Sequence, residues 1–196
     1  FHDNQAKLNH LTGEDLINLN GVIEWEKPVD TYKIRARDFT LKNNHINVSL
    51  ESDISWDPEL NVDLNVSILN SDVTHVINYL PYTNSFRARD WLKRSISSGL
   101  LRSFQLDFNG KPSQFLHGND VAAFNAKADI ENININYSDR YPEISNIDAN
   151  VEFNGLEMLM HINDGQIFEA NINSAKAYIP NLYLKEKLLT ISGAID

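Results

Sequence analysis

The chain has 196 residues, a formal net charge of −10 and no cysteine, and 42% of its residues are hydrophobic. This balance excludes a disordered tail, and the absence of cysteine excludes disulfides, zinc–thiolate sites and thiol nucleophiles. The negative charge argues against nucleic acid as a partner, because an acidic surface repels a phosphate backbone. No apolar run reaches the roughly 18 residues that a transmembrane helix needs.

Both ends of the sequence suggest a piece of something longer. The chain begins with Phe1 instead of Met, and residues 189–196 stop within a strand-like pattern. We therefore expect residues 1–196 to form a single segment of a longer protein, with any membrane anchor outside it. Near the start, residues 11–20 fit either a short helix or a strand, and the sequence leaves both open.

Residues 46–68 alternate between apolar and polar side chains, which is the period of a strand with one buried face. The alternation pauses at Pro58, because proline favours a turn and cannot donate to a strand ladder. This pattern predicts a long hairpin with one apolar and one polar face.

Two following segments show helical spacing instead. In residues 72–80 the apolar residues recur every three or four positions, and Pro81 ends the segment. A second helix is predicted near residues 90–98, with Asp90 as its N-terminal cap and Gly99 as its stop. These helices would interrupt the sheet, at about residues 72–98, between two groups of strands.

Alternating stretches then resume and continue through residues 168–172. Within residues 124–137 the apolar phase slips between Ile130 and Ile133, which predicts a β-bulge. No crossover helix intervenes, so we predict a mainly β fold, a long antiparallel meander with two short helices. Three pairs of residues are predicted as two-residue hairpin turns: Asn109–Gly110, Asn154–Gly155 and Asp164–Gly165.

A sheet with one apolar face must bury that face against something. Two arrangements satisfy this requirement: the sheet closes on itself as a sandwich or barrel, or it stays open as an apolar trough for a ligand. The two short helices are too small to cover all the predicted strands. In the open arrangement we expect the groove to be lined by Ile46, Val48, Leu50, Ile54, Leu60, Val62, Leu64, Val66, Ile68, Phe104, Leu106, Phe108, Met158 and Met160.

The sequence contains no recognisable catalytic or metal-binding motif. The glycine-rich phosphate loops, the Gly-x-Ser-x-Gly elbow and the His-Glu-x-x-His pattern are all missing. Most carboxylates fall on the polar positions of strands, where a solvated face is expected. We therefore expect no enzymatic activity, no cofactor and no metal. The scattered histidines, each of which is expected to be structural or solvated, are His2, His10, His45, His75, His117 and His161.

Basic residues gather around Trp91 inside this acidic chain, namely Arg87, Arg89, Lys93 and Arg94, followed by Arg102. One interpretation is contact with an anionic lipid head group, a membrane or a partner, with the tryptophan at an interface. The other is a surface helix whose cations face water while its apolar residues face the sheet. Both interpretations stay open at this stage.

Several short motifs follow one another in a recognisable order. Residues 75–82 contain Tyr-Leu-Pro, residues 91–99 begin with Trp-Leu and end with Gly, and residues 104–110 form a strand that ends in Gly. Downstream, Tyr141–Pro142 precedes an alternating strand that ends at Gly155. In these features most of the chain resembles the YhdP-type members of the AsmA-like proteins of Gram-negative bacteria. The family's usual Trp-Pro is Tyr-Pro here.

The resemblance implies a periplasmic segment of a large protein anchored in the inner membrane. Such proteins are similar to bridge-like lipid transporters, in which a long curved β-sheet forms an open hydrophobic groove for phospholipid between the inner and outer membranes. The partners implied are phospholipid acyl chains, neighbouring segments of the same chain and envelope proteins. The family has no catalytic residues to carry over. The resemblance favours the open trough, and the alternative is a non-catalytic structural or interaction module with a closed core.

Overall fold

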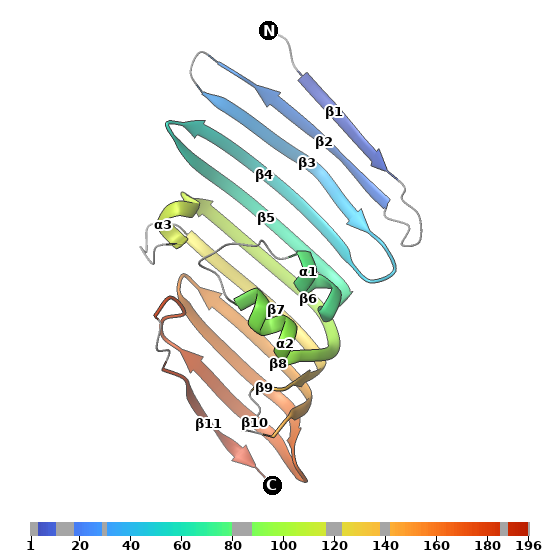
Figure 1. The fold of residues 1–196 in the computed structure, drawn as a ribbon, viewed down its shortest axis with the longest axis vertical. Helices are drawn as coiled ribbons and strands as arrows, with labels where there is room; N and C mark the ends of the chain where they lie inside the picture. The colour runs from blue at the N-terminus through green and yellow to red at the C-terminus, as the bar shows by residue number, and fades with distance from the viewer. Residues whose placement is uncertain are drawn as a thin grey trace.

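The strands of this chain pair in the order in which they occur in the sequence. The structure, a computed structural model, describes residues 4–10, 18–28, 31–79, 88–116, 123–137, 142–184 and 188–195. They form one antiparallel sheet of eleven strands, each hydrogen-bonded to its neighbours in sequence (Figure 1). The strands are β1 (Asn4–His10), β2 (Asn18–Glu26), β3 (Tyr32–Lys42), β4 (Asn47–Asp57), β5 (Glu59–Asp72), β6 (Ile96–Gly110), β7 (Ala123–Ile135), β8 (Ile144–Asn154), β9 (Glu157–Ile167), β10 (Ala170–Ile179) and β11 (Thr190–Ile195).

The predicted antiparallel meander is confirmed. The sheet is open, because β1 and β11 form its two edges in the described part of the chain. The closed sandwich or barrel is therefore not the arrangement of these strands. The long hairpin expected over residues 46–68 is β4 and β5, joined at Pro58. The undecided stretch 11–20 contributes residues 18–20 to β2, whereas residues 11–17 lie outside the described residues.

The first predicted helix is confirmed as α1 (Val73–Tyr79), although Leu80 lies outside the described residues. Asp72 caps it, since its Oδ1 accepts hydrogen bonds from the Thr74 N–H at 2.8 Å and from the Thr74 hydroxyl at 2.6 Å. Such a side-chain acceptor satisfies one of the free N–H groups in the first helical turn.

The second helix was predicted two residues too late. It is α2 (Ala88–Ser95), so Asp90 lies in its first turn instead of capping it, and residues 96–98 belong to β6. Tertiary pairing overrides the helical spacing here, because Ile96 pairs with Ile135 of β7. Gly99 is not the helix stop. Its φ of 138° and its close approach to Ile133 place it at an irregularity of β6, where a side chain would not fit.

The predicted bulge between Ile130 and Ile133 is confirmed. Asn132, with a φ of 54°, occupies the shifted register between β7 and β8. Asn70 of β5 and Asn146 of β8 also have positive φ values. Asparagine tolerates the left-handed region better than most residues, so these strands can bend where a bulge requires it.

One of the three predicted turns is found one residue later than predicted, at Gly155–Leu156, because Asn154 ends β8 and pairs with Glu157. Gly155, with a φ of 57°, turns the chain between β8 and β9. The prediction for Asn109–Gly110 is wrong, because β6 continues to Gly110 opposite Val62. A third helix that was not predicted, α3 (Pro112–Leu116), follows it. The prediction for Asp164–Gly165 is also wrong, because β9 continues to Ile167, and the turn comes at Phe168, which was expected in a strand.

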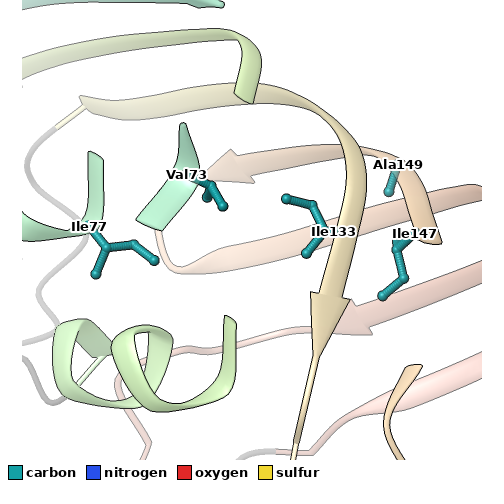
Figure 2. Packing of buried hydrophobic residues seen from close by; sticks show 5 residues of the cluster. All are labelled: Val73, Ile77, Ile133, Ile147 and Ala149. Carbon is teal, nitrogen blue, oxygen red and sulfur yellow. The ribbon is translucent and has the colours of Figure 1, made fainter. Parts of the chain in front are cut away.

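Helices α1 and α2 lie across the sheet over β6 to β8 (Figure 1). Val73 and Ile77 of α1 pack against Ile133 of β7 and against Ile147 and Ala149 of β8 (Figure 2). A second buried cluster joins Val76 of the same helix to Ile46, Ile68 and Leu101. The helices therefore cover the apolar face at the strand ends where β5 stops and β6 begins, and leave the other end of these strands without them.

Candidate functional site

The most extensive feature of the molecule is the apolar face of its sheet. Across β4, β5 and β6 the register aligns apolar side chains in rows, such as Leu50, Val66 and Leu106. The rows continue through β7 and β8 to Met158 and Met160 of β9. In antiparallel strands, directly paired residues share a face. All fourteen residues predicted to line a groove therefore lie on this one face, with Ile46 just before β4.

These fourteen residues differ in what covers them. Ile46 and Ile68 are buried beneath α1, and Phe108 is also buried. The remaining eleven are half-buried. We call the buried residues under α1 and α2 the covered end: Ile46, Ile68, Leu101, Ile133, Ile147 and Ala149. We give the name open stretch to those of the fourteen that are half-buried, lie in β4, β5 or β6 and belong to neither cluster: Leu50, Ile54, Leu60, Val62, Leu64 and Leu106.

An aromatic corner adjoins the open stretch, and it was not predicted. Trp25 pairs with Ile34, and Tyr32 pairs with Trp56, which in turn faces Leu60. Trp25 is 42% exposed, Tyr32 54% and Trp56 57%. Contiguous exposed apolar groups of this size mark contact surfaces. The alternation in β2 and β3 carries the signal for this corner, although a shifted register after Ala36 breaks it.

The opposite face of the sheet is polar. Arg35 and Arg37 of β3 pair with Asp53 of β4 at 3.1 and 2.6 Å, and Glu26 of β2 lies 3.4 Å from Arg35. Two shallow hollows in the described residues lie on this face, one of them beside these ion pairs. Their walls carry charges and amides, so they suit water better than an apolar ligand. The apolar face is therefore the stronger candidate site.

The basic residues around Trp91 do not form one cluster, because some lie on α2 and Arg102 lies on the sheet. Arg89, Lys93 and Arg94 lie on α2, whereas Arg87 lies outside the described residues. Lys93 and Arg94 are exposed to solvent, and Arg89 donates to the carbonyl of Asn78 at 3.1 Å.

The apolar side of α2 faces inward, where the half-buried Leu92 packs against the buried cluster. Trp91 is 37% exposed, and its ring packs edge-on against that of Tyr137, with 6.0 Å between the ring centroids. Arg102 instead belongs to the sheet, where it pairs with Glu131 of β7 and so lowers the pKa of that carboxyl. The helix thus presents cations on one side while its other side packs on the sheet, and head-group contact remains a prediction.

A comparison with known families decides what this architecture belongs to. A family model described as YhdP protein matches residues 10–196. The chain belongs to the YhdP family. The predicted resemblance is therefore confirmed over every strand from β2 onward. No curated protein and no solved structure matches this YhdP-family chain. Among its described helices, none has the length and apolar character to cross a membrane.

Proposed function

We propose that this YhdP-family chain is a periplasmic, non-catalytic segment of a longer envelope protein, and that its apolar face carries phospholipid acyl chains between the inner and outer membranes. The observation that carries the proposal is the open stretch. One row of apolar residues follows another across the sheet, and no second sheet lies over them in the described part of the chain. Family membership supports a role in envelope lipid transport.

The chemistry of the face suits an acyl chain. A paired sheet satisfies its own backbone hydrogen bonds, so the open stretch offers a ligand apolar side chains and no free backbone donors between them. Each methylene that moves from water onto such a surface contributes about 0.8 kcal/mol. A lipid tail needs a continuous apolar path, and the aligned rows from β4 to β9 provide one.

The proposal has consequences for the partners of this chain. Acyl chains would contact the open stretch, neighbouring segments of the same longer chain would continue the groove, and the anchor in the inner membrane of a Gram-negative bacterium would lie outside residues 1–196. Envelope proteins are further candidate partners. The net charge of −10 supports the exclusion of nucleic acid.

Photo-crosslinking in living bacteria tests the proposal. A photoreactive amino acid that replaces Leu64 lies within the open stretch on the apolar face. One that replaces the adjacent Asn65 lies on the polar face of the same strand. We expect phospholipid adducts at position 64 and few at position 65, as detected by mass spectrometry of the purified chain. Native mass spectrometry should show phospholipid bound to the wild-type chain. Equal lipid labelling at the two positions would contradict the proposal.

The aromatic corner favours a second candidate function, the docking of a protein onto the same face. Tryptophan and tyrosine are enriched at the centres of protein interfaces. Crosslinkers at Tyr32 and Trp56 distinguish the two functions. Protein adducts at these positions and at Leu64, without lipid, would favour an interaction module. Lipid adducts at all three positions favour transport.

A further inference from the structure

Two histidines and an aspartate meet at the covered end, beside the apolar face. His45 lies in the turn between β3 and β4, Asp72 is the last residue of β5, and His75 lies in the first turn of α1. One potential ligand atom from each residue lies within 4.8 Å of the other two. All three residues are half-buried. We call them the His–Asp cluster.

The backbone around the cluster is fixed by hydrogen bonds. The N–H of Asp72 donates to the carbonyl of His45 at 2.8 Å, which joins the end of β5 to the turn. Within that turn, Asn43 Oδ1 accepts from the N–H groups of His45 and Ile46, each at 2.8 Å. Ile46 is itself buried under α1. The residues that carry the three side chains are therefore held in place before any ligand arrives.

The carboxylate of Asp72 is oriented by its neighbours. Both of its hydrogen bonds from Thr74 go to Oδ1, and His75 Nδ1 lies 3.5 Å from the same oxygen. Among the described residues these contacts leave Oδ2 for a ligand. A carboxylate held by such outer contacts is the usual form of a metal ligand.

The two imidazoles are stacked face to face, with ring centroids 3.9 Å apart and an interplanar angle of 3°. One ring nitrogen of each histidine lies within 4.8 Å of the other and of the Asp72 carboxylate. Because the two lone pairs lie in parallel planes, the rings must tilt toward each other to share one ion. Both histidines are half-buried, so each borders solvent on one side.

We propose that the His–Asp cluster binds one divalent transition-metal ion of the zinc class. One nitrogen from each imidazole and Oδ2 of Asp72 are the protein ligands, and water completes the coordination. Imidazole nitrogen suits zinc, copper and nickel, whereas magnesium and calcium prefer oxygen ligands. The bound ion would tie α1 to the turn between β3 and β4, and would hold the helix over the covered end. The site is separate from the lipid face and does not depend on its function.

Zinc titration by isothermal calorimetry tests the site on the whole 196-residue chain. We expect one zinc ion per chain, and a loss of affinity of at least about tenfold in each of His45→Asn, His75→Asn and Asp72→Asn. Asparagine at position 72 keeps an oxygen that can cap the helix. The matched control is His161→Asn, since His161 is an exposed histidine of β9, and this variant should bind like wild type. Wild-type affinity in all three cluster variants, or an equal loss in the control, would overturn the proposal.

Ring nitrogen NMR of the wild-type chain provides a measurement that needs no variant. Added zinc should shift the nitrogen signals of His45 and His75 together and leave those of His161 in place. Magnesium and calcium at the same concentration should shift none of them. Zinc that shifts His161 as much as the cluster, or that leaves both cluster histidines unchanged, would show adventitious binding and refute the site.

Discussion

The covered end and the open stretch belong to one face and share one pattern of residues, yet their environments differ. Ile133 and Ile147 are each 1% exposed beneath the helices, whereas Leu64 is half-buried and Trp56, at the aromatic corner, is 57% exposed. The difference comes from α1 and α2, which are inserted between β5 and β6. Alternation therefore identifies which face is apolar, and the inserted helices decide which part of that face becomes a packed core.

The largest expected effect separates these two regions by the same kind of substitution. Ile147→Asp places a carboxylate in a packed interior, where the charge must stay unpaired or take up a proton. We expect it to lower the free energy of unfolding by about 4 kcal/mol or more. Leu64→Asp places the carboxylate beside solvent and should cost about 1–2 kcal/mol. Urea denaturation of the two variants measures the difference.

Leu64→Asp also sharpens the functional comparison, when it is paired with a substitution on the polar face. Leu64→Asp should fold, yet fail to restore envelope integrity in cells that lack the full-length protein, because the apolar path acquires one charged step. Asn65→Asp, on the polar face of the same strand, should fold and complement. A Leu64→Asp variant that unfolds as readily as Ile147→Asp would show that the open stretch is a packed core.

A smaller effect on stability is expected at two glycines near the covered end. A Cβ on Gly99 would lie 2.2 Å from Ile133 Cδ1 and 2.9 Å from its Cα, at a φ of 138°. Gly99→Ala should therefore destabilise the chain by about 1–3 kcal/mol. A Cβ on Gly165 would find Ile147 and Ile172 at an ordinary 3.7 Å, so Gly165→Ala should be neutral or slightly stabilising. Equal melting temperatures for the two variants would contradict the packing described at Gly99.

The helix cap should contribute about 1 kcal/mol, in a way that depends on pH. Because the pKa of Asp72 is lower in the folded chain than in the unfolded chain, its contribution is complete above the unfolded pKa. The contribution is lost as the pH falls through the folded pKa. Asp72→Ala should therefore destabilise the chain at pH 7 and converge with wild type in acid. Asp72→Asn should retain most of the stability and lack this pH dependence. Thermal melts of wild type and both variants from pH 7 to pH 3 measure this effect. A difference in melting temperature between wild type and Asp72→Ala that stays constant with pH would contradict the role of the carboxylate.

The smallest effect on folding is expected for the cations of α2. If α2 meets anionic head groups, Arg89→Glu combined with Arg94→Glu should weaken binding to vesicles of anionic phospholipid about tenfold or more. The wild-type binding should weaken with added salt. The stability of this variant should change by less than about 1 kcal/mol. The control is Lys127→Glu combined with Lys176→Glu, which makes the same charge change on the sheet. This control should bind vesicles more tightly than the variant with Arg89→Glu and Arg94→Glu. Equal binding by both double variants would support the solvated-helix interpretation.

Local patterns predicted those parts of the molecule in which neighbouring residues settle the structure. The hairpin at Pro58, the bulge before Ile133 and the turn at Gly155 are of this kind. The predictions failed where a partner strand decided the outcome. Pairing with β5 carries β6 through Asn109–Gly110, and pairing with Ile135 draws Ile96 out of the helical register. His45 and His75 are 30 positions apart in sequence, so their stacking depends on tertiary structure that no motif records.

The sequential strand order has a consequence for how the chain folds. Each strand pairs with the strands before and after it, so most contacts close short loops and need little loop-closure entropy. Such a sheet is nearly one-dimensional, as repeat proteins are, and hairpins can join it one at a time from any starting point. Helix α1 is the exception, because it contacts β7 and β8 from a position before β6. The middle of the sheet should thus melt as one cooperative unit, while the outer hairpins fray independently.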